Sequence, residues 1–309
     1  MKIVFMGTPE FAVASLDALV KEGHNLVGVI TAPDKPAGRG MKLQQSAVKK
    51  YAVENNLRIL QPEKLKDPQF LEELKSLQAD LQIVVAFRML PEVVWNMPPK
   101  GTINVHASLL PQYRGAAPIN WAVINGEKQT GVTTFKLKQD IDTGDILLQE
   151  SLPIGDDETA GELHDRMKET GAVLLVRTVQ GLIDDVLQEK SQSSVTNHLS
   201  SDIKHAPKIF ADTCKIDWNK PVADVHNLIR GLSPFPGAFT IFNERVLKIY
   251  KSEKEIKRPN ISPGKFETDS KTHLKFACAD GYLVVKELQL EGKKRMMVEE
   301  FLRGFRIAQ

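Results

Sequence analysis

The sequence predicts a doubly wound, mostly parallel α/β sheet followed by a second domain built as a small β-barrel. Two observations carry this prediction. Short apolar runs alternate with helical patterns through the first part of the chain, as in parallel sheets with helices on both faces. After residue 207, short runs of strand-forming residues separated by turns follow one another instead, which is typical of small barrels.

In the first part, the apolar runs predict strands and the regular apolar stripes predict helices. The strand signals lie at residues 2–6, 26–31, 81–87, 102–108, 131–138 and 145–154. Run 81–87 is almost entirely apolar, which indicates a strand buried on both faces. Helical stripes cover residues 10–21 and 159–187. Such a sheet binds its ligands beyond the carboxyl ends of the strands.

A polar, serine-rich stretch without periodicity separates the two patterns and predicts a linker. We therefore expect a catalytic domain over residues 1–188, a linker over 189–206 and a β-barrel domain over 207–309. In the last of these, helices are expected at 224–231 and 298–303. Its strand signals lie at 238–242, 246–250, 274–278 and 282–290.

Composition narrows the class of protein. The chain has 309 residues, of which 42% are hydrophobic and 26% charged, as in globular proteins. Its two cysteines, Cys214 and Cys278, lie far apart, which argues against disulfides and suits a reducing cytoplasm. No apolar run is long enough to cross a bilayer. Residues 205–309 hold 19 basic and 13 acidic side chains, which favours a polyanionic partner, although an ordinary solvated surface explains the excess equally well.

One polar pattern points to catalysis. Asn104 and His106 are two positions apart in an apolar strand, so their side chains share a face. Asp142 follows in a short acidic loop. An amide, an imidazole and a carboxylate can stabilise an oxyanion and move a proton during acyl transfer. No serine or cysteine nucleophile with a partner base accompanies them, which favours direct transfer to an acceptor.

Each of these residues also has an ordinary interpretation. Asn104 and His106 could be polar residues whose hydrogen bonds the backbone satisfies, and Asp142 could be a turn residue. A zinc site at His106 is possible in principle, but no second and third ligand stand at a useful spacing, so we expect no metal. The loop over residues 31–43 carries Lys35, Arg39 and Lys42 and could contact phosphate, or be a mobile surface loop.

Four motifs together resemble the 10-formyltetrahydrofolate-dependent formyltransferase family. They are Asn-Val-His at 104–106, Ser-Leu-Leu-Pro at 108–111, Tyr-Arg-Gly-Ala-Ala-Pro at 113–118 and Asp-Thr-Gly-Asp-Ile at 142–146. Two further stretches, 33–40 and 229–237, resemble the branch of that family that acts on methionyl-tRNA. Arg88 stands where the family usually has glycine.

The resemblance implies a Rossmann-like formyltransferase domain, an OB-like C-terminal barrel and a reaction. The formyl group of 10-formyltetrahydrofolate would pass, without a metal, to the α-amine of initiator methionyl-tRNA for translation initiation. Asn104 and His106 would stabilise the oxyanion, and Asp142 would orient His106. Implied tRNA contacts are Arg39, Lys35 and Lys42. Implied folate contacts are Ser108, Leu109, Leu110, Pro111, Phe87, Arg88 and Met89.

Three other functions stay open at this point. An amino-sugar nucleotide formyltransferase also joins this signature to a second domain, but the 33–40 loop and the basic C-terminal part disfavour it. A formyltetrahydrofolate hydrolase would leave residues 205–309 unexplained. An RNA-binding protein without activity would not need Asn104, His106 and Asp142 together. No membrane and no obligate protein partner are expected.

Overall fold

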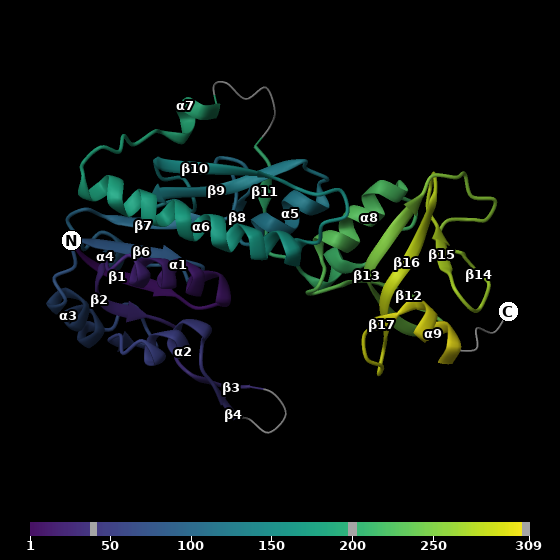
Figure 1. Ribbon diagram of the computed structural model, residues 1–309, viewed down its shortest axis with the longest axis horizontal. Coiled ribbons are helices and arrows are strands. Elements are labelled where there is room, and N and C mark those ends of the chain that lie inside the picture. Colours follow the sequence, from purple (N-terminus) through teal and green to yellow (C-terminus); the bar gives the residue numbers. More distant parts are fainter. Residues whose placement is uncertain (38–41, 197–202, 305–309) are drawn as a thin grey trace. The chain divides into compact units, whose positions relative to one another are not determined.

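A mostly parallel sheet forms the centre of the first part of the computed structural model, as the sequence predicts (Figure 1). The structure describes residues 1–37, 42–196 and 203–304. They form two compact units: unit 1 comprises residues 1–114, 131–152 and 164–204, and unit 2 comprises 115–130, 153–163 and 205–309. The division into 1–188, 189–206 and 207–309 stays a prediction.

The sheet of unit 1 has seven strands. Five of them, β7, β6, β1, β2 and β5, pair in parallel. Strand β9 runs antiparallel to β7. The chain moves from β1 to β2 on one side and returns to β6 on the other. In spatial order the strands are β10 (Ile146–Pro153), β9 (Gln129–Lys136), β7 (Thr102–His106), β6 (Leu81–Val85), β1 (Lys2–Gly7), β2 (Asn25–Ile30) and β5 (Ile59–Leu60).

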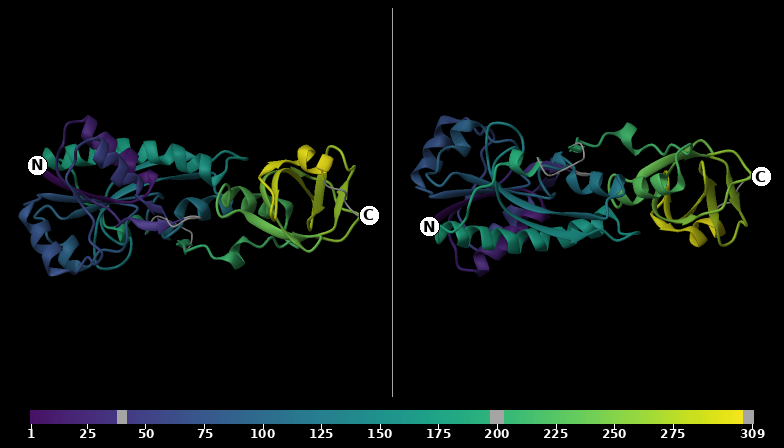
Figure 2. Two further views of the ribbon diagram at one scale, coloured as in Figure 1. Left: turned by 90° about the horizontal axis from the view of Figure 1, so that it is seen from below. Right: turned by 90° about the horizontal axis from the view of Figure 1, so that it is seen from above.

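Helices cover both faces of this sheet (Figure 2). On one face lie α1 and α6, where Gly171 of α6 approaches Val105 and Val132. On the other, Phe70 and Leu74 of α3 share a buried cluster with strand residues such as Val4. The prediction of a doubly wound sheet is confirmed. The helices are α1 (Glu10–Lys21), α2 (Ala47–Glu54), α3 (Pro68–Ser76), α4 (Glu92–Trp95), α6 (Ala160–Ile183) and α7 (Gln192–Thr196).

Unit 2 contains a curled antiparallel sheet in the order β12-β13-β16-β15-β14, with β17 beside β16. Strand β13 shifts register twice against β16, which bends and twists the sheet. The predicted small barrel is therefore present as a half-barrel. Further helices and strands of the chain are α5 (Pro118–Ile124), β8 (Arg114–Gly115), β11 (His205–Ala206), a 3₁₀ turn (Ala211–Cys214), α8 (Val222–Gly231), β12 (Ala238–Phe242), β13 (Arg245–Glu255), β14 (Phe266–Thr268), β15 (Leu274–Ala277), β16 (Tyr282–Leu290), β17 (Met296–Met297) and α9 (Val298–Gly304).

Helix α8 packs on this sheet through a buried apolar face. Val225 and Ile229 share a core cluster with Leu247 and Val285 of the strands. Trp218 stacks on Phe276 with ring centroids 4.6 Å apart. Unit 2 thus has a hydrophobic core of its own. No helix within the described ranges is both long and apolar enough to span a membrane.

The stability of unit 2 is expected to depend on the protonation of His226. This side chain is 2% exposed, and its Nδ1 lies 3.0 Å from Ser252 Oγ. Burial lowers the pKa of His226, and the positive charge of Lys254 lowers it further. The exposed carboxylate of Asp157, 3.1 Å from Nε2, has the opposite effect on this pKa. Because the unfolded chain binds the proton more readily, the free energy of unfolding should fall as the pH drops below about 6.5, by at most about 1.4 kcal/mol per pH unit.

Denaturant unfolding at pH 7.5 and pH 5.5 checks this expectation. His226→Gln should lose much of the pH dependence, whereas His205→Gln, at an exposed position in the same unit, should keep it. An unchanged dependence in His226→Gln would show that another group is responsible.

Candidate active site

The candidate site lies where the parallel strands of unit 1 end. The direction of the chain reverses between β1 and β6, and β7 is the next strand beyond β6. Open α/β sheets bind ligands in the crevice outside the carboxyl ends of their strands at such a switch point. His106 is the last residue of β7, and Val85, the last of β6, pairs with Val105 beside it. The sheet therefore presents His106 at this edge.

Asn104 and His106 share one face of β7, as the sequence predicts. Ile103 and Val105 alternate with them and are buried on the other face. Asn104 is half-buried, and among the residues that the structure describes none forms a hydrogen bond with its side chain. Its amide is therefore able to bind a ligand at the sheet edge.

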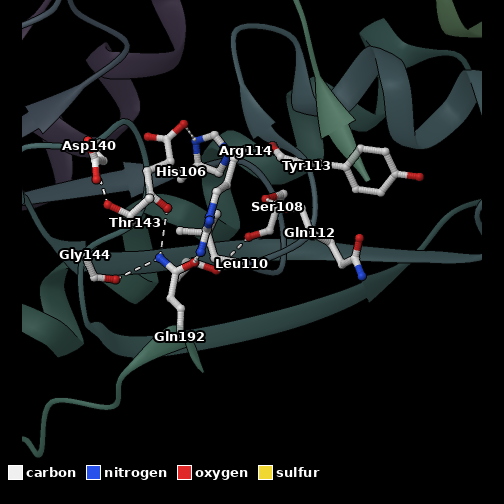
Figure 3. A network of polar contacts seen from close by, with 12 residues as sticks. His106, Ser108, Leu110, Gln112, Tyr113, Arg114, Asp140, Thr143, Gly144 and Gln192 are labelled. Atoms are coloured by element: carbon white, nitrogen blue, oxygen red, sulfur yellow. Dashed lines mark hydrogen bonds and ion pairs between the residues drawn. The ribbon is translucent and has the colours of Figure 1, made fainter. Parts of the chain in front are cut away.

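Both ring nitrogens of His106 face groups of the protein (Figure 3). Nε2 lies 2.9 Å from the carbonyl oxygen of Tyr113. Because a carbonyl oxygen only accepts, Nε2 carries a proton and donates it. Nδ1 faces Asp142 Oδ2 at 3.8 Å, and the two side chains are only 8% and 11% exposed. The structure therefore brings His106 and Asp142 together, with Nδ1 on the side of the carboxylate.

The loop after β7 is held by its own buried hydrogen bonds. Ser108 Oγ donates to the carbonyl of Gln112, and the hydroxyl of Thr133 donates to that of Ser108 and accepts from the amide of Leu110. Ser108, Leu110 and Pro111 are buried. Of the predicted folate contacts in this loop, Leu109 alone is half-exposed. The side chains of Ser108 and Leu110 therefore shape the loop.

The other predicted folate contacts, residues 87–89, lie in the loop that follows β6, the strand beside the one that ends at His106. Ala86, which follows β6, has a φ of 48°, and Phe87 is half-buried. Arg88 donates to the carbonyls of Pro62 and Glu63, and its guanidinium lies 5.5 Å from the Phe87 ring centroid. A depression of about 840 Å³ opens against this loop and includes Arg88 and Met89, but not Phe87, in its lining. Arg88 thus anchors the loop to the segment before α3.

The predicted tRNA residues lie on a different segment. Residues 31–43, predicted as a loop, contain a short antiparallel hairpin of β3 (Lys35–Ala37) and β4 (Lys42–Gln44). Lys35 is exposed. The backbone of Lys42 pairs with Ala37, and Arg39 lies outside the described residues. Asp34 anchors the base of the hairpin by accepting from Lys49 Nζ at 2.5 Å and Gln61 Nε2 at 2.9 Å.

Two further residues belong to the site: Arg114, which lies in the 113–118 motif but had no predicted role, and Gln192. Arg114 and Gln192 join the loop after β7 to the loop that carries Asp142 (Figure 3). Gln192 falls in the stretch predicted as a linker, where no periodicity marks a buried residue. Within residues 1–37, 42–196 and 203–304, no three His, Cys, Asp or Glu side chains are grouped as a metal site would require.

Comparison with known proteins identifies the family of this chain. Residues 1–179 match the family model described as "Formyl transferase", and residues 208–306 match "Formyl transferase, C-terminal domain". The chain belongs to the formyl transferase family.

Relatives narrow the family further. The chain is 52% identical over 314 residues to a methionyl-tRNA formyltransferase of Bacteroides fragilis, with 100% of this chain and 96% of the relative covered. It is 55% identical over 312 residues to that of Parabacteroides distasonis, with 99% and 96% covered. This similarity puts the chain in one branch of the family, the methionyl-tRNA formyltransferases.

Solved structures share the fold at much lower identity. An N-formyltransferase from Helicobacter canadensis, in complex with folinic acid and dTDP-3-aminofucose, superposes with a TM-score of 0.66. The match covers 96% of this chain and 100% of that chain at 22% identity. At this identity the likeness shows the fold and not the acceptor.

Proposed function

We propose that this protein transfers the formyl group of 10-formyltetrahydrofolate to the α-amine of initiator methionyl-tRNA. The observation that carries the proposal is the identity of 52% with a methionyl-tRNA formyltransferase over the full length of the chain. The product starts translation, so we place the reaction in the cytoplasm, which two widely separated cysteines also favour.

In the proposed reaction, the amine nitrogen bonds to the formyl carbon, the bond from that carbon to N10 of the folate breaks, and a proton moves from the amine to N10. The formyl oxygen carries negative charge in between. The amide of Asn104, and His106 when it is protonated, stabilise that charge at the sheet edge. Asp142, 3.8 Å from Nδ1, holds the imidazole and accepts the proton on its way.

For the folate, we propose binding by the loop 87–89 and by residues 108–111. The 840 Å³ depression beside Arg88 and Met89 is of the size that small-molecule sites have. Met89 is 73% exposed there and offers an apolar surface to a pterin ring. Residues 108–111 would offer chiefly backbone groups and Leu109, since Ser108, Leu110 and Pro111 are buried.

For the tRNA, we propose contacts by the β3–β4 hairpin and by the basic residues of 205–309. Lys35 lies on β3 and Lys42 on β4, which pair with each other, and Arg39 falls between them in the sequence. In residues 205–309 basic side chains outnumber acidic ones, 19 to 13, which favours binding to a phosphate backbone.

One assay tests the proposed function. The enzyme is given folate labelled in the formyl group, together with initiator methionyl-tRNA, a dTDP-amino sugar, or no acceptor. We expect label in methionyl-tRNA. Label in the sugar nucleotide, or in free formate at the same rate whether or not tRNA is added, would contradict the proposal.

Arg39→Ala is expected to lower kcat/KM for methionyl-tRNA by about 10-fold, because a guanidinium grips phosphate or a base edge with two hydrogen bonds. The slow hydrolysis of the formyl-folate without tRNA should stay unchanged, because it needs only Asn104, His106 and Asp142. Lys50→Ala, an exposed charge on α2, is the control. If both activities of Arg39→Ala fall together, the residue serves the catalytic centre or the fold instead.

A further inference from the structure

Gln192 is a buried amide in a segment that is otherwise polar and exposed. It is 3% exposed and begins helix α7. Residues 1–179 and 208–306 match the two family models, so Gln192 lies in the interval between them. Buried side-chain amides are normally hydrogen-bonded. The hydrogen-bond partners of Gln192 are Arg114 and the backbone of the Asp142 loop, which lie on the two sides of His106.

The donor end of Gln192 holds the loop that carries Asp142. Nε2 donates to the carbonyl oxygen of Asp142 at 2.9 Å and to that of Gly144 at 2.8 Å. Asp142 has a φ of 54°, in the left-handed region that a residue with a side chain adopts only when its surroundings hold it there. Both amide hydrogens of Gln192 therefore bind the backbone of the loop that directs the Asp142 carboxylate toward His106.

The side-chain oxygen of Gln192 binds Arg114, in the loop whose Tyr113 contacts His106. Oε1 accepts from Arg114 Nε at 3.0 Å and from Nη2 at 2.5 Å. Arg114 directly follows Tyr113, whose carbonyl oxygen accepts from His106 Nε2. The charged donor makes this pair of hydrogen bonds strong.

We propose that Gln192 is a positioning residue for catalysis: its amide ties the loop that holds His106 Nε2 to the loop that presents Asp142 to Nδ1. The proposal rests on the proposed function, in which His106 and Asp142 act on the substrate. An error of about 1 Å in such a pair can cost roughly 100-fold in rate. Part of the segment that the sequence predicts as a linker therefore belongs to the catalytic unit.

The test compares three variants of the full chain in formyl transfer to methionyl-tRNA. Gln192→Ala removes both ends of the bridge. Gln192→Glu keeps an acceptor for Arg114 but sets a carboxylate against the carbonyls of Asp142 and Gly144. Gln188→Ala, at an exposed glutamine four residues earlier, is the control. We expect both Gln192 variants to lose about 10-fold or more in kcat with KM for both substrates within about 2-fold, and the control to match wild type.

A double-mutant cycle separates positioning from a general structural role. If Gln192 acts through Asp142, Gln192→Ala should cost nothing more in an Asp142→Asn background. A loss that multiplies with that of Asp142→Asn would overturn the proposal, as would wild-type kcat in either Gln192 variant. Should Gln192→Ala fail to fold, Gln192→Glu decides, and failure of both to fold would mean that the residue serves the fold.

The same cycle distinguishes this proposal from the proposed function. If Asp142→Asn itself keeps wild-type activity, the assignment of the catalytic pair is wrong, whatever the Gln192 variants do. If Asp142→Asn is inactive while the folded Gln192 variants are fully active, the positioning role alone is wrong.

Discussion

Asp142→Asn is expected to lower kcat for formyl transfer by about 100-fold or more while the protein stays folded. The substitution keeps the shape of the side chain but removes the negative charge 3.8 Å from His106 Nδ1. A neutral amide neither stabilises a protonated imidazole nor accepts the proton of the attacking amine, and loss of such a group typically costs about 100- to 10,000-fold. His106→Gln should cause a similar loss.

Single-turnover kinetics with labelled formyl-folate measure this directly, because they isolate the chemical step from product release. Asp140→Asn is the matched control, since it makes the same change at an exposed position of the same loop and should leave the rate unchanged. Folding is checked by thermal unfolding. A folded Asp142→Asn or His106→Gln protein with a near-normal single-turnover rate would remove the residue from the catalytic centre.

The sheet could be predicted because its strands are buried. Residues 81–85 are apolar except for Gln82 and are buried on both faces, so the run itself marks a strand, and the structure confirms it as β6. The elements that the sequence analysis missed have weaker patterns. Helix α2 has only Val48 and Ala52 buried, and β5 is two residues long. The loop predicted over 31–43 contains the paired strands β3 and β4, which are three residues each and too short to leave a strand pattern in the sequence.

The candidate site, like the fold, could be predicted only in part. Asn104 and His106 could be placed on one face because strand geometry is local, and their shared face follows from a spacing of two. The bridge through Gln192 could not be predicted. It joins residues 114, 142 and 192, and a contact between segments so far apart leaves no periodic signal in one sequence. The anchoring role of Arg88 also depends on two carbonyls of another segment, Pro62 and Glu63.

Gly144→Ala is expected to cause the second large loss, at a residue that touches no substrate. A Cβ at position 144 would lie 1.5 Å from the carbonyl oxygen of Lys136, far inside any real contact, and 3.1 Å from the Phe135 ring. Lys136 ends strand β9 and accepts little movement, because its amide donates to the carbonyl of Asp145 at 3.0 Å. The Asp142 loop must therefore move away from β9.

That movement would draw the Asp142 carboxylate from His106 and the Gly144 carbonyl from Gln192, so we expect kcat to fall by roughly 100-fold. The unfolding free energy should fall by about 1–3 kcal/mol, as overpacking typically costs. Gly304→Ala is the control, because none of the described residues lies within 4 Å of its added Cβ. The loss should appear in kcat and persist well below the melting temperature, where destabilisation alone has no effect. Wild-type kcat in folded Gly144→Ala would mean that the loop tolerates displacement, and that a close fit against β9 is not what aims Asp142 at His106.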